Sequence, residues 1–225
     1  MTTRKNVRYC ASFAALAAAM CLFVFLNINS GSVRLSPGET ARILLGGMGE
    51  ETAYRIIWDI RLPRLLAAVI LGGALSVSSF LLQTFFANPI AGPFVLGISS
   101  GAKLVVALLT IALLGRGIPV GSGLMILAAF AGAMISMGFV LLISGRVKKM
   151  SMLVICGIMI GYICSAVTDF VITFADDADI VNLHNWSMGS FSGISWENIR
   201  VMAAVVAVSM ALTFLMAKPI GAYQL

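Results

Sequence analysis

Residues 124–143 form a run without a single charged side chain, and comparable runs recur along the chain. A helix rises 1.5 Å per residue, so about 20 residues are needed to cross the ~30 Å hydrocarbon core of a bilayer. Hydrophobic residues make up 60% of the chain and charged residues only 11%, against about 25% charged residues in an ordinary soluble domain. The sequence therefore predicts an integral membrane protein embedded in a lipid bilayer.

We expect one all-α, polytopic transmembrane helical bundle of about six spans. The first apolar run follows basic residues, which also fits a secretory signal peptide. It is long and lacks a clear small-residue cleavage site, so a retained helix is predicted. The expected spans cover about 9–28, 65–86, 94–114, 124–143, 152–174 and 201–217.

Turn and cap residues mark the ends of these segments. Ser36 before Pro37 and Glu39 predicts the start of a short surface helix, since serine caps and proline favours the first helical position. Asn88 and Pro89 predict a break after the second span, because proline lacks the backbone donor that a helix needs.

The distribution of charge predicts topology. The net charge is +6, but the basic residues are scattered between apolar runs and form no stripe of the kind that binds nucleic acid. Lysine and arginine favour cytoplasmic loops, so "RKNVR", "GRVKKM" and Lys218 predict a cytoplasmic N-terminus. The segment that then lies outside is nevertheless rich in arginine, which indicates another role for these residues: Arg34, Arg42, Arg55, Arg61 and Arg64.

No pattern predicts an enzyme. The four cysteines lie in apolar segments without ligand spacing, which suggests neither a metal site nor a disulfide framework. The single histidine, His184, precedes Trp186 and is predicted to be interfacial. Phosphate-binding glycine loops, metalloprotease motifs and nucleophile elbows are lacking. We therefore expect no catalytic residue, metal or cofactor, and transport through the chain would need energy from an ion gradient or another protein.

Small residues recur at four-residue spacing in four of the expected spans. Helices in lipid associate where small side chains let their backbones approach closely. Any single pair fits the general abundance of small residues in such helices, but four pairs in four spans predict a tightly packed bundle. The pairs are Gly72 and Ser76, Gly97 and Gly101, Gly132 and Ser136, and Gly157 and Gly161.

The fifth expected span contains a carboxylate. Asp169 lies close in the helix to Ser165 and Thr168, and polar groups within a span are costly unless they face a cavity or a partner. Two interpretations remain open, the lining of a polar cavity and a structural hydrogen-bond network.

Residues 61–102, "RLPRLLAAVILGGALSVSSFLLQTFFANPIAGPFVLGISSGA", resemble the signature region of the FecCD family. Its members are permease subunits of bacterial ABC importers for iron-siderophores, haem and vitamin B12. Two further stretches agree with the family in order, "GSVRLSPGET" and "NWSMGSFSGISWENI". The resemblance implies a permease fold of ten helices.

The resemblance also implies partners and sites. Such permeases work as homo- or heterodimers with two cytoplasmic ATP-binding subunits and an extracytoplasmic substrate-binding protein. Arg61 and Arg64 become candidates for docking that protein, positioned by Pro63, although anchoring to lipid phosphates competes with this interpretation. Paired guanidiniums suit carboxylate recognition.

In the family the fifth helix lines the translocation path, which implies path roles for Ser165, Thr168 and Asp169. The run with Asn88, Pro89, Gly97 and Gly101 then forms the turn and packing surface into the next helix.

Family members run to well over 300 residues, so residues 1–225 are expected to represent the N-terminal part of the permease domain, without the coupling loop and the C-terminal helices. The function implied is inward transport of an iron-siderophore, or of haem or cobalamin, energised by a separate ATPase. The alternative from a different class is an ion-coupled secondary transporter or channel that uses the intramembrane Asp169.

Overall fold

The structure is a computed structural model that describes residues 2–46, 50–114, 118, 120–147 and 150–216. Within these ranges the chain is all helical, without strands, which confirms the predicted fold class. The elements in order are α1 (Thr2–Asn29), α2 (Pro37–Leu44), α3 (Glu51–Arg55), the π-helical η1 (Ile56–Arg61), α4 (Leu62–Phe85), α5 (Ile98–Leu114), α6 (Ser122–Ser144), α7 (Met150–Ile172), α8 (Asp177–Met188) and α9 (Trp196–Leu215).

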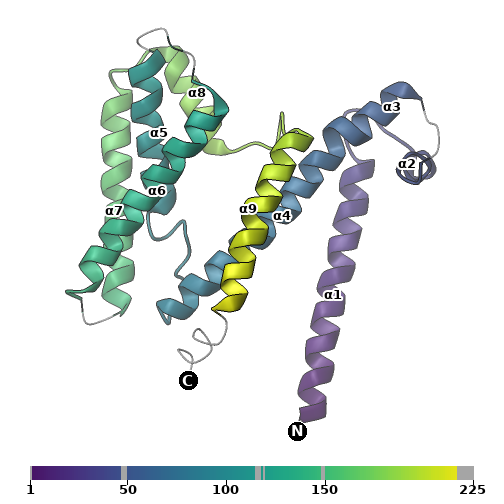
Figure 1. Cartoon of the computed structure of the whole chain (residues 1–225), viewed down its shortest axis with the longest axis horizontal. Coiled ribbons are helices and arrows are strands. Elements are labelled where there is room, and N and C mark those ends of the chain that lie inside the picture. Colours follow the sequence, from purple (N-terminus) through teal and green to yellow (C-terminus); the bar gives the residue numbers. More distant parts are fainter. Residues whose placement is uncertain (1, 47–49, 115–117, 119, 148–149, 217–225) are drawn as a thin grey trace. The chain divides into compact units, whose positions relative to one another are not determined.

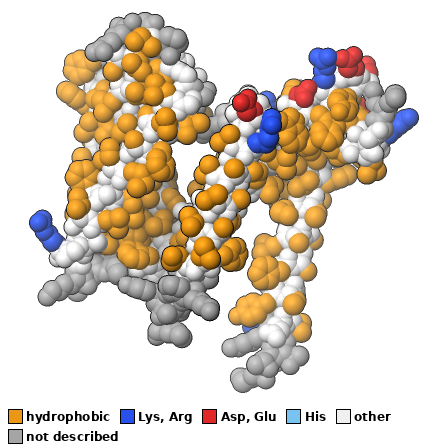
Figure 2. Space-filling model, viewed as in Figure 1, with side chains coloured by type: hydrophobic (Ala, Val, Ile, Leu, Met, Phe, Trp, Pro, Cys, Tyr) orange, Lys and Arg blue, Asp and Glu red, His pale blue; other side chains and the backbone are white. Residues whose placement is uncertain are grey.

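Five of the described helices are long and apolar enough to cross a membrane. They cover Asn6–Asn29, Glu51–Phe85, Gly123–Ser144, Ser151–Ile172 and Trp196–Leu215, and a shorter apolar helix covers Ile98–Leu113. Figure 2 shows hydrophobic side chains over the visible faces of α1, α6 and α7, the kind of surface that lipid tails cover. The chain is therefore a multi-pass membrane protein.

Several predicted span boundaries differ from the observed helix ends. The second predicted span, about 65–86, corresponds to α4, but the helical run extends back to Glu51. The sixth, predicted from about 201, begins at Trp196. The third begins later than residue 94, at Ile98, because Gly97 before it takes a positive φ of 72°. Three lysines that entered the topology prediction lie outside the described residues: Lys148, Lys149 and Lys218.

The chain divides into two compact units, residues 1–72 with 191–210 and residues 73–190 with 211–225. In the first unit, Ile43, Ala53 and Ile57 form a small buried core. Ser36 caps α2 as predicted, its Oγ accepting a hydrogen bond from the Glu39 backbone N–H at 3.2 Å. The indole N–H of Trp196 donates to the backbone oxygen of Trp58 at 2.9 Å, which ties α9 to η1.

In the second unit, α5 packs against α6, α7 and α8, as Figure 1 shows. Two apolar clusters lie between these elements. One contains the buried Phe86, Leu96 and Val140. The other contains Val106 and Leu183. Short helices and irregular turns join the spans at their ends.

Candidate functional site

The side chain of Arg61 is buried in the first unit. Arg61 is only 8% exposed, and its guanidinium donates hydrogen bonds to the backbone oxygens of Ile28 and Val33. The Ile28 carbonyl lies at the C-terminal end of α1, where the helix dipole is negative and a cation is favoured. Arg61 therefore caps the C-terminus of α1 and holds the loop that follows α1 against η1.

The loop that Arg61 holds passes very close to it. A Cβ atom added at Gly31 would lie 2.7 Å from Nη2 of Arg61 and 3.2 Å from its Cζ. A larger residue at this point would require the guanidinium to shift. The local sequence around Arg61, Pro63 and Arg64 did not predict that Arg61 is buried. The backbone oxygens that Arg61 binds lie 28 and 33 residues earlier in the chain.

Pro63 is buried within the helical run from Glu51 to Phe85. A proline inside an α-helix removes one hydrogen bond and clashes with the carbonyl four residues earlier. Here the preceding turn is π-helical, and the N–H of Leu62 bonds to the oxygen of Ile57, one residue farther back than in an α-helix. The wider turn accommodates the proline ring, so the helix continues through Pro63.

Arg64 differs from Arg61 in its surroundings. It is exposed, and its guanidinium makes no hydrogen bond or ion pair with the rest of the described chain. Nearby on α3, Arg55 pairs with Glu51 at 2.8 Å, in a contact that is itself exposed. The structure therefore separates the two predicted docking residues into one buried cation and one free surface cation.

Asn88 and Pro89 lie in the turn that follows α4. The Oδ1 atom of Asn88 accepts a hydrogen bond from the N–H of Ile90 at 2.9 Å, a side-chain turn that asparagine favours. The neighbouring Phe86 and Ala91 are buried, at 1% and 0% exposure, and anchor both ends of the turn. This geometry directs the chain back toward α5.

Gly97 and Gly101 lie at the start of α5, where it meets two other helices of the second unit. A Cβ added at Gly97 would lie 2.7 Å from the backbone nitrogen of Gly161 and 2.8 Å from the oxygen of Gly157, both on α7. A Cβ added at Gly101 would lie 2.6 Å from Cβ of Ser136 on α6. These contacts join the backbones of α5, α6 and α7 directly.

Ser136 and Gly132 complete the contact on α6. The Ser136 hydroxyl donates to the backbone oxygen of Gly97 at 3.0 Å, and Gly132 lies against the backbone oxygen of Gly101. Three of the four small-residue pairs thus lie where helices meet. At Gly72, of the fourth pair, an added Cβ would meet no described atom within 4 Å.

The three path candidates on α7 do not converge. Ser165 is half-buried, with its Oγ 3.4 Å from Oγ of Ser100. Thr168 is 1% exposed and donates to the backbone oxygen of Cys164 within its own helix at 2.7 Å. The Asp169 side chain is exposed. Ser165 lines a pocket, whereas Thr168 faces the packed interior.

The pocket beside Ser165 has a volume of about 260 Å³ and lies between the start of α5 and α7. Sequence reasoning missed Ser100, Phe94 and Tyr162 among its lining residues. Ser100 lies three residues after Gly97, and helical spacing of i and i+3 was the signal that could have placed the two on one face. No group of three or more potential metal ligands occurs among the described residues.

The sequence pattern of most of the chain identifies its family. Residues 19–225 match the sequence pattern that defines the FecCD transport family. The chain belongs to the FecCD transport family. The match includes Arg61 and Arg64, the contacts of Gly97 and Gly101, and the pocket beside Ser165.

Curated relatives of this FecCD chain include two proteins named vitamin B12 import system permease protein BtuC. The protein of Citrobacter koseri is 36% identical over 207 residues, which cover 92% of this chain and 59% of the relative. The protein of Salmonella newport is 36% identical over 205 residues, which cover 91% of this chain and 59% of the relative. The chain thus spans about three fifths of the length of these relatives.

A solved structure shows the same fold at low sequence identity. It is described as an inward-facing conformation of a protein of the "metal-chelate type ABC transporter" class, and it matches with a TM-score of 0.76 and 20% identity. The match covers 96% of this chain and 65% of the other. The FecCD chain therefore has the fold of that transporter over nearly its whole length.

Proposed function

We propose that the chain is a membrane-spanning part of the permease of an ABC importer, which moves a metal chelate inward across a bacterial cytoplasmic membrane with energy from separate ATP-binding subunits. The observation that carries the proposal is the family match over residues 19–225. The contacts of Gly97 with α7 and of Gly101 with α6 support the proposal. Both glycines lie in the family's signature region, and their backbones lie directly against the neighbouring helices. The N-terminus is proposed to be cytoplasmic.

The proposed substrate is a corrinoid, with an iron-siderophore or haem as the other members of the same class. Two named relatives import vitamin B12, and a corrinoid is itself a metal chelate, the class named for the structural neighbour. These relatives favour cobalamin over the iron-siderophore expected from the sequence alone.

Uptake measurements test this function. Membrane vesicles that carry the chain with its ATP-binding and substrate-binding partners should accumulate radiolabelled cobalamin only when ATP is supplied, and more than a radiolabelled ferric siderophore. Uptake that needs no ATP and collapses with a protonophore would instead support the ion-coupled alternative that uses Asp169, and would reject the proposal.

We assign docking of the substrate-binding protein to Arg64 and a positioning role to Arg61. Arg64 is exposed and free to meet a carboxylate, whereas the donors of Arg61 are occupied by backbone oxygens. Charges at the rim of an interface mainly raise the association rate and the salt dependence of binding.

The substitution Arg64→Glu tests the docking role. It is expected to weaken binding of the substrate-binding protein about tenfold or more at low salt, since a charge reversal replaces attraction by repulsion. Surface plasmon resonance on the solubilised complex measures this. Arg42→Glu is the matched control, because Arg42 is also exposed and in the same unit. Equal weakening by both variants would leave Arg64 no specific role.

The pocket beside Ser165 is proposed to form part of the wall of the translocation path. Ser165→Leu is expected to lower ATP-dependent cobalamin uptake severalfold, because the larger side chain fills space next to Ser100. The control is Ala166→Leu, at an exposed neighbour on the same helix. Vesicle uptake at matched protein amounts is the measurement, and equal losses in both variants would contradict the assignment.

A further inference from the structure

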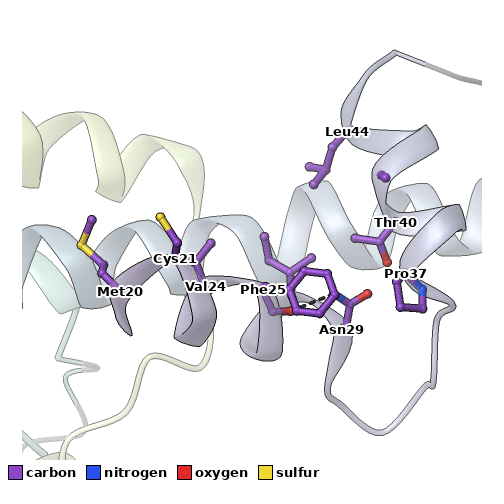
Figure 3. Close-up of a pocket in the computed structure, with 10 residues that line it drawn as sticks. Met20, Cys21, Val24, Phe25, Asn29, Pro37, Thr40 and Leu44 are labelled. Carbon is purple, nitrogen blue, oxygen red and sulfur yellow. Dashed lines mark hydrogen bonds between the residues drawn. The ribbon is translucent and has the colours of Figure 1, made fainter. Parts of the chain in front are cut away.

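A narrow apolar groove lies between α1 and α2 in the first unit. Its volume is about 290 Å³. Apolar side chains line most of it, and Figure 3 shows them along α1 with Met20 at one end and Asn29, Pro37 and Thr40 at the other. Apolar grooves of this kind are poorly hydrated and favour apolar ligands.

The end of the groove at Asn29 and Thr40 is polar and lacks partners. The amide nitrogen of Asn29 donates to the Phe25 backbone oxygen at 2.8 Å, which leaves its Oδ1 as an acceptor. Both Oδ1 of Asn29 and Oγ1 of Thr40 are buried without a hydrogen-bond partner among the described residues. Thr40 is 3% exposed. Leaving such groups unsatisfied is costly, so their burial indicates a ligand that both accepts and donates hydrogen bonds.

The length of the groove matches one leaflet of a bilayer. Its lining on α1 runs from Met20 to Asn29, which corresponds to ~14 Å at 1.5 Å per residue. Half of the ~30 Å hydrocarbon core is about 15 Å. The apolar part of α1 is Asn6–Asn29, so the groove occupies the half of the span that ends at Asn29.

The groove is narrow. A volume of about 290 Å³ spread over this length averages a cross-section of about 20 Å², which suits a single hydrocarbon chain. A helix with its side chains is about 10–12 Å in diameter, so a transmembrane segment could place side chains in the groove but could not lie within it.

We propose that this groove binds one acyl chain of an amine-headed phospholipid such as phosphatidylethanolamine. The chain lies along α1, and the polar part of the lipid sits at Asn29 and Thr40. The lipid ammonium group donates a hydrogen bond to Oδ1 of Asn29, and the Thr40 hydroxyl donates to a phosphate or ester oxygen. The bound lipid holds α2 against α1 at the membrane surface.

Native mass spectrometry and thermal unfolding of the purified permease test the proposal, with phosphatidylethanolamine and phosphatidylcholine of identical acyl chains as probes. Choline lacks N–H donors, so the ethanolamine lipid is expected to bind about tenfold more tightly. Saturating phosphatidylethanolamine should raise the melting temperature by roughly 5 °C. Thr40→Val keeps the shape but removes the hydroxyl, and is expected to lose most of this rise.

Ala41→Trp fills the groove, since Ala41 lines it, and should abolish retention of the lipid. Ala15→Trp, at an exposed position on α1 outside the groove, is the matched control and should retain it. Equal affinity for the two lipids, or equal retention by the two tryptophan variants, would overturn the proposal. A change of oligomeric state in Ala41→Trp without loss of lipid would also overturn it, in favour of a protein occupant.

Discussion

Replacing Arg61 by leucine is expected to lower the melting temperature of the detergent-solubilised protein by about 6–12 °C. The substitution removes two hydrogen bonds from a charged donor, each worth about 1.5–3 kcal/mol, and leaves the oxygens of Ile28 and Val33 without these donors. A combined loss of about 3 kcal/mol corresponds to this shift for a chain of 225 residues. Thermal unfolding in detergent is the measurement.

Two further variants separate the role of Arg61 from its charge alone. Arg61→Lys keeps the charge but replaces a planar fork by a single ammonium group, so it should restore only part of the stability. Arg42→Leu removes an exposed arginine from the same unit and should change stability by no more than about 0.5 kcal/mol. An Arg61→Leu protein as stable as Arg42→Leu would disprove the role assigned to this guanidinium.

The substitution Gly97→Ala is expected to destabilise the second unit by about 2–5 kcal/mol, enough to lower the amount of folded protein. Two costs add. The positive φ of 72° costs an alanine about 1–2 kcal/mol. The added Cβ also overlaps backbone atoms of Gly157 and Gly161 at 2.7–2.8 Å, and backbone cannot swing away as a flexible side chain can, so α5 and α7 must separate.

Gly138→Ala provides the comparison for Gly97→Ala. Gly138 lies inside α6, and a Cβ added there meets no described atom within 4 Å, so alanine should leave stability unchanged or raise it by about 0.5–1 kcal/mol. Size-exclusion profiles and melting temperatures of the two variants give the readout. If Gly97→Ala elutes and melts like Gly138→Ala, the close contact of α5 with α7 is not essential to the fold.

Features set by neighbouring residues were predictable from the sequence. The long apolar runs predicted the all-helical membrane fold, and Ser36 with Pro37 predicted the cap of α2, because these effects act within one helical turn. The spacing of the glycine pairs indicated close packing, although the pattern alone did not specify which helices meet.

Features set by distant contacts were not predictable. Arg61 is buried because a loop about thirty residues earlier folds back onto it, and no local pattern carries that information. The helix continues through Pro63 because the π-helical η1 widens the preceding turn. Proline usually marks a helix boundary, so this continuation was not expected from the sequence. Ser165, Thr168 and Asp169 are close in sequence, but their rotation about α7 separates a pocket wall from a packed interior and an exposed face.

The glycine contacts of α5, α6 and α7 also bear on the order of assembly during synthesis. All of them lie within one continuous stretch, from Gly97 to Gly161, and contacts of smaller sequence separation tend to form earlier. The first unit instead needs Trp196 to reach Trp58, a separation of 138 residues. Because synthesis proceeds from the N-terminus, we expect α5, α6 and α7 to be able to associate before α9 is made, whereas the contact of Trp196 with Trp58 can form only after it.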